Sequence, residues 1–194
     1  MTTVAEIIRQ VRRNISDMDK VGYDDEELLQ WVNEGNGYIR KLVEQYKPNL
    51  LYRRETGEGK TIDLADVPMK IHRITVENRD LQYMPTLPTV TQKGSPYSYY
   101  RIGTEVALFP EPDEPVKWTV IYVPPQPLYT LDGVVEWVHD FDYVLIEYAT
   151  IRAQYRNEFM MTQEEQIMST LTQQLVAMLS GMDNKQLIME GYWP

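Results

Sequence analysis

Residues 94–113 read GSPYSYYRIGTEVALFPEPD, two strand-like runs on either side of Gly103. Gly103-Thr104 suits a two-residue type II′ turn, which takes glycine at its first central position. A hairpin closed by this turn pairs Ile102 with Glu105, Tyr100 with Ala107, Ser98 with Phe109 and Tyr99 with Leu108. Both of its surfaces are largely apolar, whereas a sheet with one face in water alternates more cleanly. The stretch therefore predicts a small sandwich or barrel, or a sheet with one face against another subunit.

Other strand-like runs surround the hairpin and are separated by proline-containing turns. They lie at residues 61–64, 71–76 and 116–123. The segment 57–61, GEGKT, lacks the spacing of a phosphate-binding loop and is followed by a strand pattern, so we interpret it as an ordinary loop. These runs together predict one β module.

Helical patterns precede and follow this module. Thr3 and Glu6 form a capping box before the first helix. Asp24 begins a second helix, whose apolar stripe continues until Pro48 ends it, and Gly35 within this helix predicts a close approach by a neighbouring element. After residue 136, periodic apolar residues predict two more helices, the last ending near Gly181.

This order predicts an α+β fold, a four-helix bundle with an antiparallel β module inserted between helices 2 and 3, plus an extended C-terminal tail. The expected boundaries are residues 1–52 for the N-terminal helices of the bundle, 53–136 for the β module, 137–182 for the C-terminal helices and 183–194 for the tail.

Composition excludes several functions. The 19 basic residues face 29 acidic ones, giving a net charge of −10, which argues against tight nucleic-acid binding because such binding depends on phosphate neutralisation. The absence of cysteine fits a reducing cytosol and removes thiol chemistry. Neither a membrane-spanning stretch nor a signal peptide is recognisable, so we expect a cytoplasmic protein of the cell that makes it.

Candidate catalytic groups are few. His72 and His139 stand apart from any second histidine at metal-ligand spacing. The acidic clusters at 24–27 and 164–165 coincide with helix starts, where negative charge is favourable, and the cluster at 111–114 coincides with a turn. We therefore expect a protein that is not an enzyme, with no catalytic residues, no metal site and no cofactor.

Several segments fall in a recognisable order. They are YDDEELLQWVNE (23–34), IDLADVP (62–68), IHRI (71–74), GSPY (94–97) with VALFPEPD (106–113), Tyr122 leading into PPQPL (124–128), and DFDYVLIEYA (140–149). In this order and spacing, over roughly residues 20–155, the sequence resembles the head-to-tail adaptor (connector) proteins of tailed bacteriophages.

The resemblance implies a structural virion protein. It implies a ring, commonly of twelve copies, docked on the portal protein and offering a platform to the tail or nozzle protein. DNA would pass through the channel without sequence-specific binding, and an acidic wall would let it slide. The implied location is the neck of the virion, between head and tail, after assembly in the host cytoplasm, with no membrane partner.

Two groups of residues are the expected contact sites. The apolar residues Leu187, Ile188, Tyr192 and Trp193 follow the last helix and are expected to contact the portal, or alternatively to fold back onto their own bundle. The hairpin residues Tyr97, Tyr99, Tyr100, Leu108 and Phe109 are expected at the interface between subunits. Alternative functions are another neck or tail protein, such as a stopper or head-completion protein, and, less expected, a cell-wall hydrolase.

Overall fold

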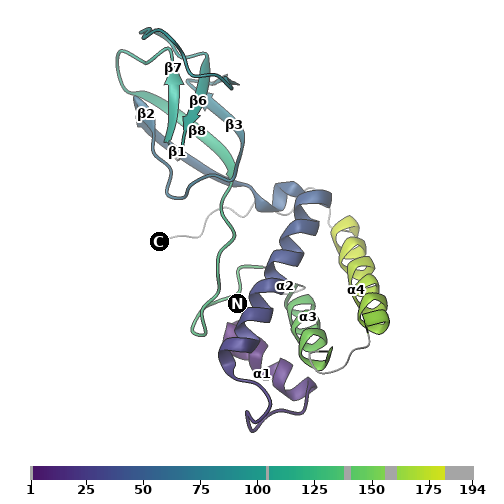
Figure 1. Cartoon of the computed structure of the whole chain (residues 1–194). Coiled ribbons are helices and arrows are strands. Elements are labelled where there is room, and N and C mark those ends of the chain that lie inside the picture. Colours follow the sequence, from purple (N-terminus) through teal and green to yellow (C-terminus); the bar gives the residue numbers. More distant parts are fainter. Residues whose placement is uncertain (1, 104, 138–140, 156–160, 182–194) are drawn as a thin grey trace. The chain divides into compact units, whose positions relative to one another are not determined.

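The computed structural model describes residues 2–103, 105–137, 141–155 and 161–181 (Figure 1). The chain divides into two compact units. Residues 1–50 with 126–194 contain the α-helices and are called the helical unit, and residues 51–125 contain the strands and are called the β unit.

The helical unit contains four α-helices, α1 (Val4–Asn14), α2 (Asp25–Tyr46), α3 (Asp142–Tyr155) and α4 (Met161–Gly181). The predicted capping box of Thr3 and Glu6 is present at α1, and the Asp24 side chain accepts a 2.7 Å hydrogen bond from the backbone N–H of Glu27 at the start of α2. Beyond α2, the chain forms a 3₁₀ turn, η1 (Pro48–Leu51). These helix starts follow directly from local sequence chemistry.

Helices α2 and α3 form the centre of the helical unit, because α1 packs on both and α4 also packs on both (Figure 1). A Cβ added at Gly35 of α2 would lie 3.1 Å from Cδ1 of Tyr148 and 3.4 Å from Cδ2 of Leu145, both on α3. The predicted close approach at Gly35 is therefore confirmed.

Residues 126–137, called the return segment, are held against α2 by two asparagine side chains. Asn36, only 1% exposed, donates a 3.0 Å hydrogen bond to the backbone oxygen of Pro127 and accepts one of 2.7 Å from Trp137 Nε1. Asn33 accepts a 2.7 Å hydrogen bond from the backbone N–H of Tyr129. Burial raises the pKa of Tyr129 to about 12.

The β unit contains two sheets of four strands. The first has the order β1 (Arg53–Gly59), β8 (Val116–Val123), β3 (Lys70–Val76), β4 (Arg79–Asp80). The second has the order β2 (Thr61–Ile62), β7 (Glu105–Phe109), β6 (Ser98–Ile102), β5 (Gln82–Tyr83). Neighbouring strands are antiparallel except β5 and β6, which are parallel.

Both sheets contribute to one hydrophobic core in the β unit. Its buried members are Ile62, Ile74, Val76, Leu81, Tyr99, Val106, Leu108, Trp118, Val120 and Tyr122. The hydroxyl of Tyr122 donates a hydrogen bond to Glu55, and burial together with this carboxylate raises the pKa of Tyr122 to about 12. The core thus lies between two sheets, as in a small sandwich.

The predicted fold class is wrong. We expected a four-helix bundle with a single inserted β module. The chain instead combines four α-helices, of which α1 and α4 each pack on both α2 and α3, with two four-stranded sheets. One cause is β1, which the interpretation of residues 57–61 as a loop overlooked. The partner of β1 is β8, which lies far along the chain, with Arg53 opposite Tyr122 and Gly59 opposite Val116. No local sequence pattern therefore indicates that residues 53–59 form a strand.

Candidate interaction surfaces

The predicted hairpin forms with the expected register. Tyr99 pairs with Leu108, Tyr100 with Ala107, Ser98 with Phe109 and Ile102 with Glu105. Gly103 has a φ of 60°, in the left-handed region that favours glycine. The predicted turn type also depends on Thr104, which lies outside the described residues.

One side of the hairpin belongs to the core of the β unit. Tyr99 is 7% exposed and Leu108 is 4% exposed, and Val106 is buried with them. Burial raises the pKa of the Tyr99 hydroxyl. These side chains hold the hairpin to the sheet beneath it, because apolar area removed from water stabilises the packed state.

Other residues at the hairpin are more exposed, although Ser98 is buried. Tyr97 is 58% exposed and lies edge-on to Phe109, with ring centroids 5.8 Å apart. Tyr100 and Phe109 are half-buried, and Ile102 is exposed. Of the five hairpin residues expected at an interface, Tyr97, Tyr100 and Phe109 therefore offer surface, whereas Tyr99 and Leu108 are covered by their own chain.

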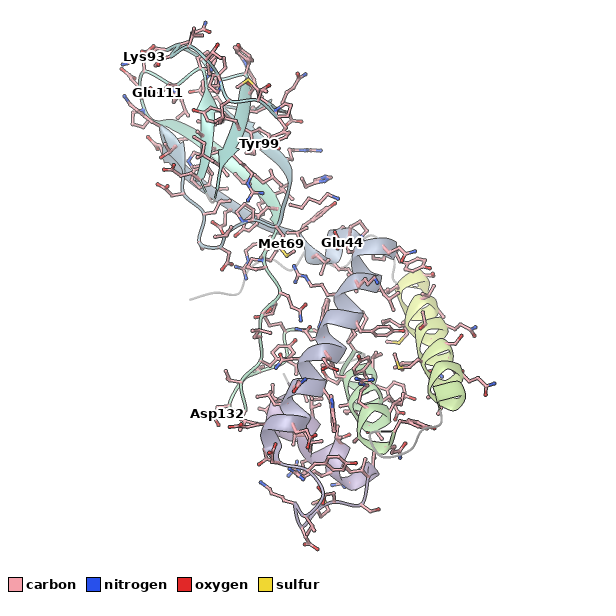
Figure 2. All side chains as sticks on the ribbon, viewed as in Figure 1. Glu44, Met69, Lys93, Tyr99, Glu111 and Asp132 are labelled. Atoms are coloured by element: carbon pink, nitrogen blue, oxygen red, sulfur yellow. The ribbon has the colours of Figure 1, made fainter. Side chains whose placement is uncertain are left out.

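The connection between β5 and β6, residues 84–97, adds further exposed apolar groups. Leu87 and Val90 in this connection are exposed, as is Tyr83 just before it. It is tied to the strand pair by an isolated bridge between Lys93 and Glu111 (Figure 2), where the Glu111 backbone oxygen accepts a 3.0 Å hydrogen bond from the N–H of Gly94. Residues 81–92 contain no charged side chain. An uncharged, partly apolar surface of this kind is typical of protein contacts.

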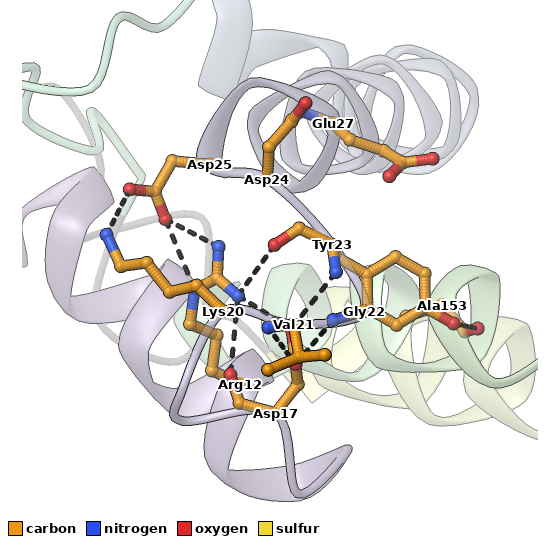
Figure 3. Close-up of polar contacts among 10 residues, drawn as sticks. All are labelled: Arg12, Asp17, Lys20, Val21, Gly22, Tyr23, Asp24, Asp25, Glu27 and Ala153. Carbon is orange, nitrogen blue, oxygen red and sulfur yellow. Dashed lines mark hydrogen bonds and ion pairs between the residues drawn. The ribbon is translucent and has the colours of Figure 1, made fainter.

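A buried arginine organises the start of the helical unit (Figure 3). Arg12, 3% exposed, donates from Nη1 to Asp17 Oδ2 (2.8 Å) and to the backbone oxygen of Tyr23 (3.0 Å), and from Nη2 to Asp25 Oδ1 (2.7 Å). The Tyr23 hydroxyl in turn donates a 2.6 Å hydrogen bond to the backbone oxygen of Ala153 on α3. The Arg12 guanidinium thereby holds together the two ends of the loop between α1 and α2.

The two carboxylates in this cluster are held in their ionised form. Asp17 accepts hydrogen bonds from the N–H groups of Val21 (2.9 Å) and Gly22 (2.8 Å), and the Gly22 bond is the chief reason that the pKa of Asp17 is lowered. Hydrogen bonds from Lys20 and from the guanidinium lower the pKa of Asp25. A general acid at neutral pH needs a raised pKa, so these groups are structural.

The structure describes only some of the remaining candidate groups. His72 stacks on Tyr52, with ring centroids 4.6 Å apart, and His139 lies outside the described residues. Among the residues that the structure describes, no group of three or more His, Cys, Asp or Glu could hold a metal ion. An open hollow of about 700 Å³ has a mixed polar and apolar lining, made of Thr56, Gly57, Glu58, Thr75, Glu77, Asn78, Pro115, Lys117, Trp118 and Thr119.

The expected portal contacts Leu187, Ile188, Tyr192 and Trp193 lie outside the described residues, so their placement stays a prediction. The interactions of Arg12, Asn33 and Asn36 were not anticipated from the sequence. Asn33 and Asn36 could have been noticed as polar residues on or beside the apolar stripe of α2, whereas the partners of Arg12 come from a loop with no periodic pattern.

Comparison with known proteins assigns the family. The family model described as SU10 adaptor protein matches residues 2–189, nearly the whole chain. The chain belongs to this family, and the resemblance to head-to-tail adaptors of bacteriophages is confirmed. A comparison with curated proteins found no match.

Family membership supports a structural role as a bacteriophage adaptor, in contact with other components of the virion neck. In the part of the chain that the structure describes, no helix is long and apolar enough to cross a membrane.

Proposed function

We propose that this chain is a head-to-tail adaptor that forms a homo-oligomeric ring, commonly of twelve copies, between the portal and the tail or nozzle. The ring completes the channel through which DNA leaves the head, without sequence-specific contacts to the DNA. The observation that carries the proposal is the match of the adaptor family to residues 2–189. The net charge of −10 agrees with a wall along which DNA slides.

The exposed and half-buried aromatic residues of the hairpin are the proposed contribution of the β unit to contacts between copies or with the next neck protein. Tyr97 supplies a large exposed aromatic ring that lies edge-on to the half-buried Phe109, and Tyr100 on β6 is also half-buried. Aromatic side chains are enriched in the centres of protein interfaces. Tyr99 and Leu108 support this surface from the core side, where they keep the hairpin rigid.

The C-terminal segment is the proposed contact with the portal, through Leu187, Ile188, Tyr192 and Trp193. Apolar and aromatic residues in such a segment gain most from burial against a partner protein. Removal of residues 183–194 tests this assignment. Loss of portal binding with unchanged thermal stability supports it, whereas a truncated chain that still binds the portal contradicts it. A large loss of stability would favour the alternative in which the segment folds back on the helices.

Electron micrographs of the chain mixed with the portal protein of the same phage test the proposed function as a whole. The expected result is an additional ring beneath the portal, whose symmetry gives the copy number. Binding only to an already assembled neck, and not to the portal, would instead indicate a stopper or another completion protein. Cell-wall cleavage that a single Glu→Gln substitution abolishes would indicate a hydrolase.

The hairpin is tested with a matched pair of tyrosine variants. Tyr97→Asp places a charge on the proposed contact, and Tyr143→Asp places the same charge on another exposed tyrosine, on α3. We expect the first variant to lose ring formation or attachment of the next neck protein while it keeps its folding stability, and the second to behave as the wild type.

A further inference from the structure

Strand β1 is a long edge strand in a unit whose other sheet edges are short. In the described part of the β unit, the edge strands β2, β4 and β5 contain two residues each, whereas β1 contains seven. Very short edge strands protect a sheet, because a longer edge presents backbone groups to which a further strand can pair. Strand β1 is therefore the edge of the β unit best able to accept another strand.

The backbone of β1 alternates between groups that face β8 and groups that face away from it. The backbone oxygen of Lys117 on β8 accepts a 3.1 Å hydrogen bond from the N–H of Glu77, on the side of β3. Lys117 is paired with Glu58 of β1, so this pair is one of those that exchange no ladder hydrogen bonds. The N–H and C=O groups of Glu58, and of Thr56 and Arg54 at two-residue steps along the strand, therefore point away from β8.

The outer edge of β1 carries no second ladder. In the described chain, no backbone hydrogen bond outside the strand ladders involves Arg54, Thr56 or Glu58. The loop after β2 reaches the strand through side chains instead. The N–H of Ala65 donates a 3.1 Å hydrogen bond to the carboxylate of Glu55, and Asp66 forms an ion pair with Arg53. An incoming strand can thus pair with the backbone of β1 while these side-chain contacts persist.

The sequence of β1 is complementary to itself in the antiparallel direction. When Thr56 lies opposite Thr56 of a second copy, all seven residues pair, and Arg54 lies opposite Glu58 at two symmetric positions. Both charged residues are exposed, and neither forms an ion pair in the part of the chain that the structure describes. A shift by two residues places Glu55 opposite Glu55, or Arg54 opposite Lys60. Opposite charges across a ladder are favourable and like charges are unfavourable, so one register is selected.

This register also aligns the backbone groups of the two copies. Residues that face each other across the two-fold axis are Thr56 with Thr56 and Arg54 with Glu58, and all of them have N–H and C=O groups that point outward. Such pairs exchange both of their hydrogen bonds in an antiparallel ladder. Side-chain charge and backbone geometry therefore favour the same alignment.

The charge of the β unit favours a second copy as the partner. Residues 51–125 contain nine basic and ten acidic residues, so most of the net charge of −10 lies outside this unit. Two β units can therefore approach each other with little electrostatic repulsion. A self-complementary strand matches its own copy by symmetry, whereas another protein would need the same order of charges.

We propose that β1 pairs with β1 of a second copy around a two-fold axis at Thr56, which joins two four-stranded sheets into one of eight strands. The contact uses the same surface on both copies and therefore closes at a dimer. It covers an edge that would otherwise promote aggregation. The dimer is a form of the chain free of other neck proteins, and the inference does not rest on the proposed ring.

A charge reversal tests the pairing. Sedimentation of the chain alone over a range of concentrations measures dimer formation. We expect Arg54→Glu and Glu58→Arg each to weaken the dimer about tenfold, because each variant places like charges opposite one another at two positions. The double variant restores opposite charges and should form the dimer as the wild type does. The control is Arg79→Glu, at an exposed position of β4, which should leave the dimer unchanged.

A disulfide gives a second result that does not depend on a disruptive variant. The chain has no cysteine, so Thr56→Cys introduces a single thiol. Residues opposite each other in a hydrogen-bonded antiparallel pair have Cα atoms about 5.5 Å apart, which a disulfide can span. Under mild oxidation we expect Thr56→Cys to form a linked dimer at least about tenfold faster than Thr86→Cys, which changes another exposed threonine of the β unit.

Three results would overturn the pairing. They are a wild-type chain that stays monomeric, a dimer that neither single charge variant weakens, and equal rates of disulfide formation at positions 56 and 86. Protection of the β1 amides from hydrogen exchange only when another neck protein binds would assign the added strand to that protein instead. These results leave the adaptor function intact, and absence of a ring on the portal would contradict that function without affecting the dimer.

Discussion

The indole ring of Trp118 on β8 lies over the backbone of Gly57 on β1. The two residues are paired in the ladder between these strands, and a Cβ added at Gly57 would lie 2.3 Å from Cζ2 of the ring. An aromatic side chain that covers a cross-strand glycine compensates for the weak strand propensity of that glycine. A glycine at position 57 of β1 therefore leaves room for the Trp118 ring above its backbone.

Gly57→Ala should destabilise the β unit by about 1–3 kcal/mol, because the added methyl group forces the buried Trp118 ring to shift. Urea unfolding followed by circular dichroism measures the change. In a Trp118→Leu background the same substitution should cost much less, and an unchanged cost would show that the ring is not the cause.

Gly35 and Gly37 in α2 should respond differently to alanine. At Gly37 a Cβ would meet the far end of the flexible Gln126 side chain at 3.2 Å, so the better helix propensity of alanine should prevail and raise stability by up to about 1 kcal/mol. At Gly35 the ring of Tyr148 must move, so Gly35→Ala should be less stable than Gly37→Ala by about 1 kcal/mol. Thermal unfolding of the two variants gives the comparison.

Asn36→Leu should lower the free energy of unfolding of the helical unit by about 1–3 kcal/mol, because the Trp137 N–H and the Pro127 carbonyl, both part-buried, lose their hydrogen-bond partner. Helical circular dichroism during urea unfolding measures this loss. Gln45→Ala, at an exposed position of the same helix, serves as the control and should change stability little. Equal losses from both variants would contradict a specific role for Asn36.

The cluster around Arg12 should make the helical unit sensitive to acid. Folding lowers the pKa of Asp17 and Asp25, so the folded state is favoured while these groups are ionised. This contribution is present above the unfolded pKa of about 3.9 and is lost as the pH falls below it. We expect the thermal unfolding temperature to fall between pH 4 and pH 2 and to fall less steeply in Asp17→Asn.

The control for the acid experiment is Asp132→Asn, which changes an exposed carboxylate in the return segment of the same unit (Figure 2). This variant should retain the wild-type dependence on pH. A wild-type profile in Asp17→Asn would show that the carboxylate of Asp17 contributes nothing to acid stability.

Local chemistry allowed part of this structure to be predicted. Thr3 and Asp24 mark helix starts because their side chains satisfy backbone N–H groups close by in sequence. The register between Tyr99 and Leu108 was equally accessible, because a two-residue turn at Gly103 leaves only one pairing. In each case the determining contacts lie within a few residues of one another.

Long-range partners limited the prediction elsewhere. The polar stretch that contains Gly57 has the sequence pattern of a loop. It forms a strand because it pairs with β8, which is far away along the chain. The role of Arg12 has no local sequence signal, because its carboxylate partners come from the following loop and from the start of α2.

The β unit begins and ends on adjacent strands, since Arg53 of β1 lies opposite Tyr122 of β8. The chain therefore enters and leaves the β unit at neighbouring points, which is the geometry that domain insertion requires. A larger, smaller or unrelated domain could replace residues 51–125 during evolution without altering how the helices pack.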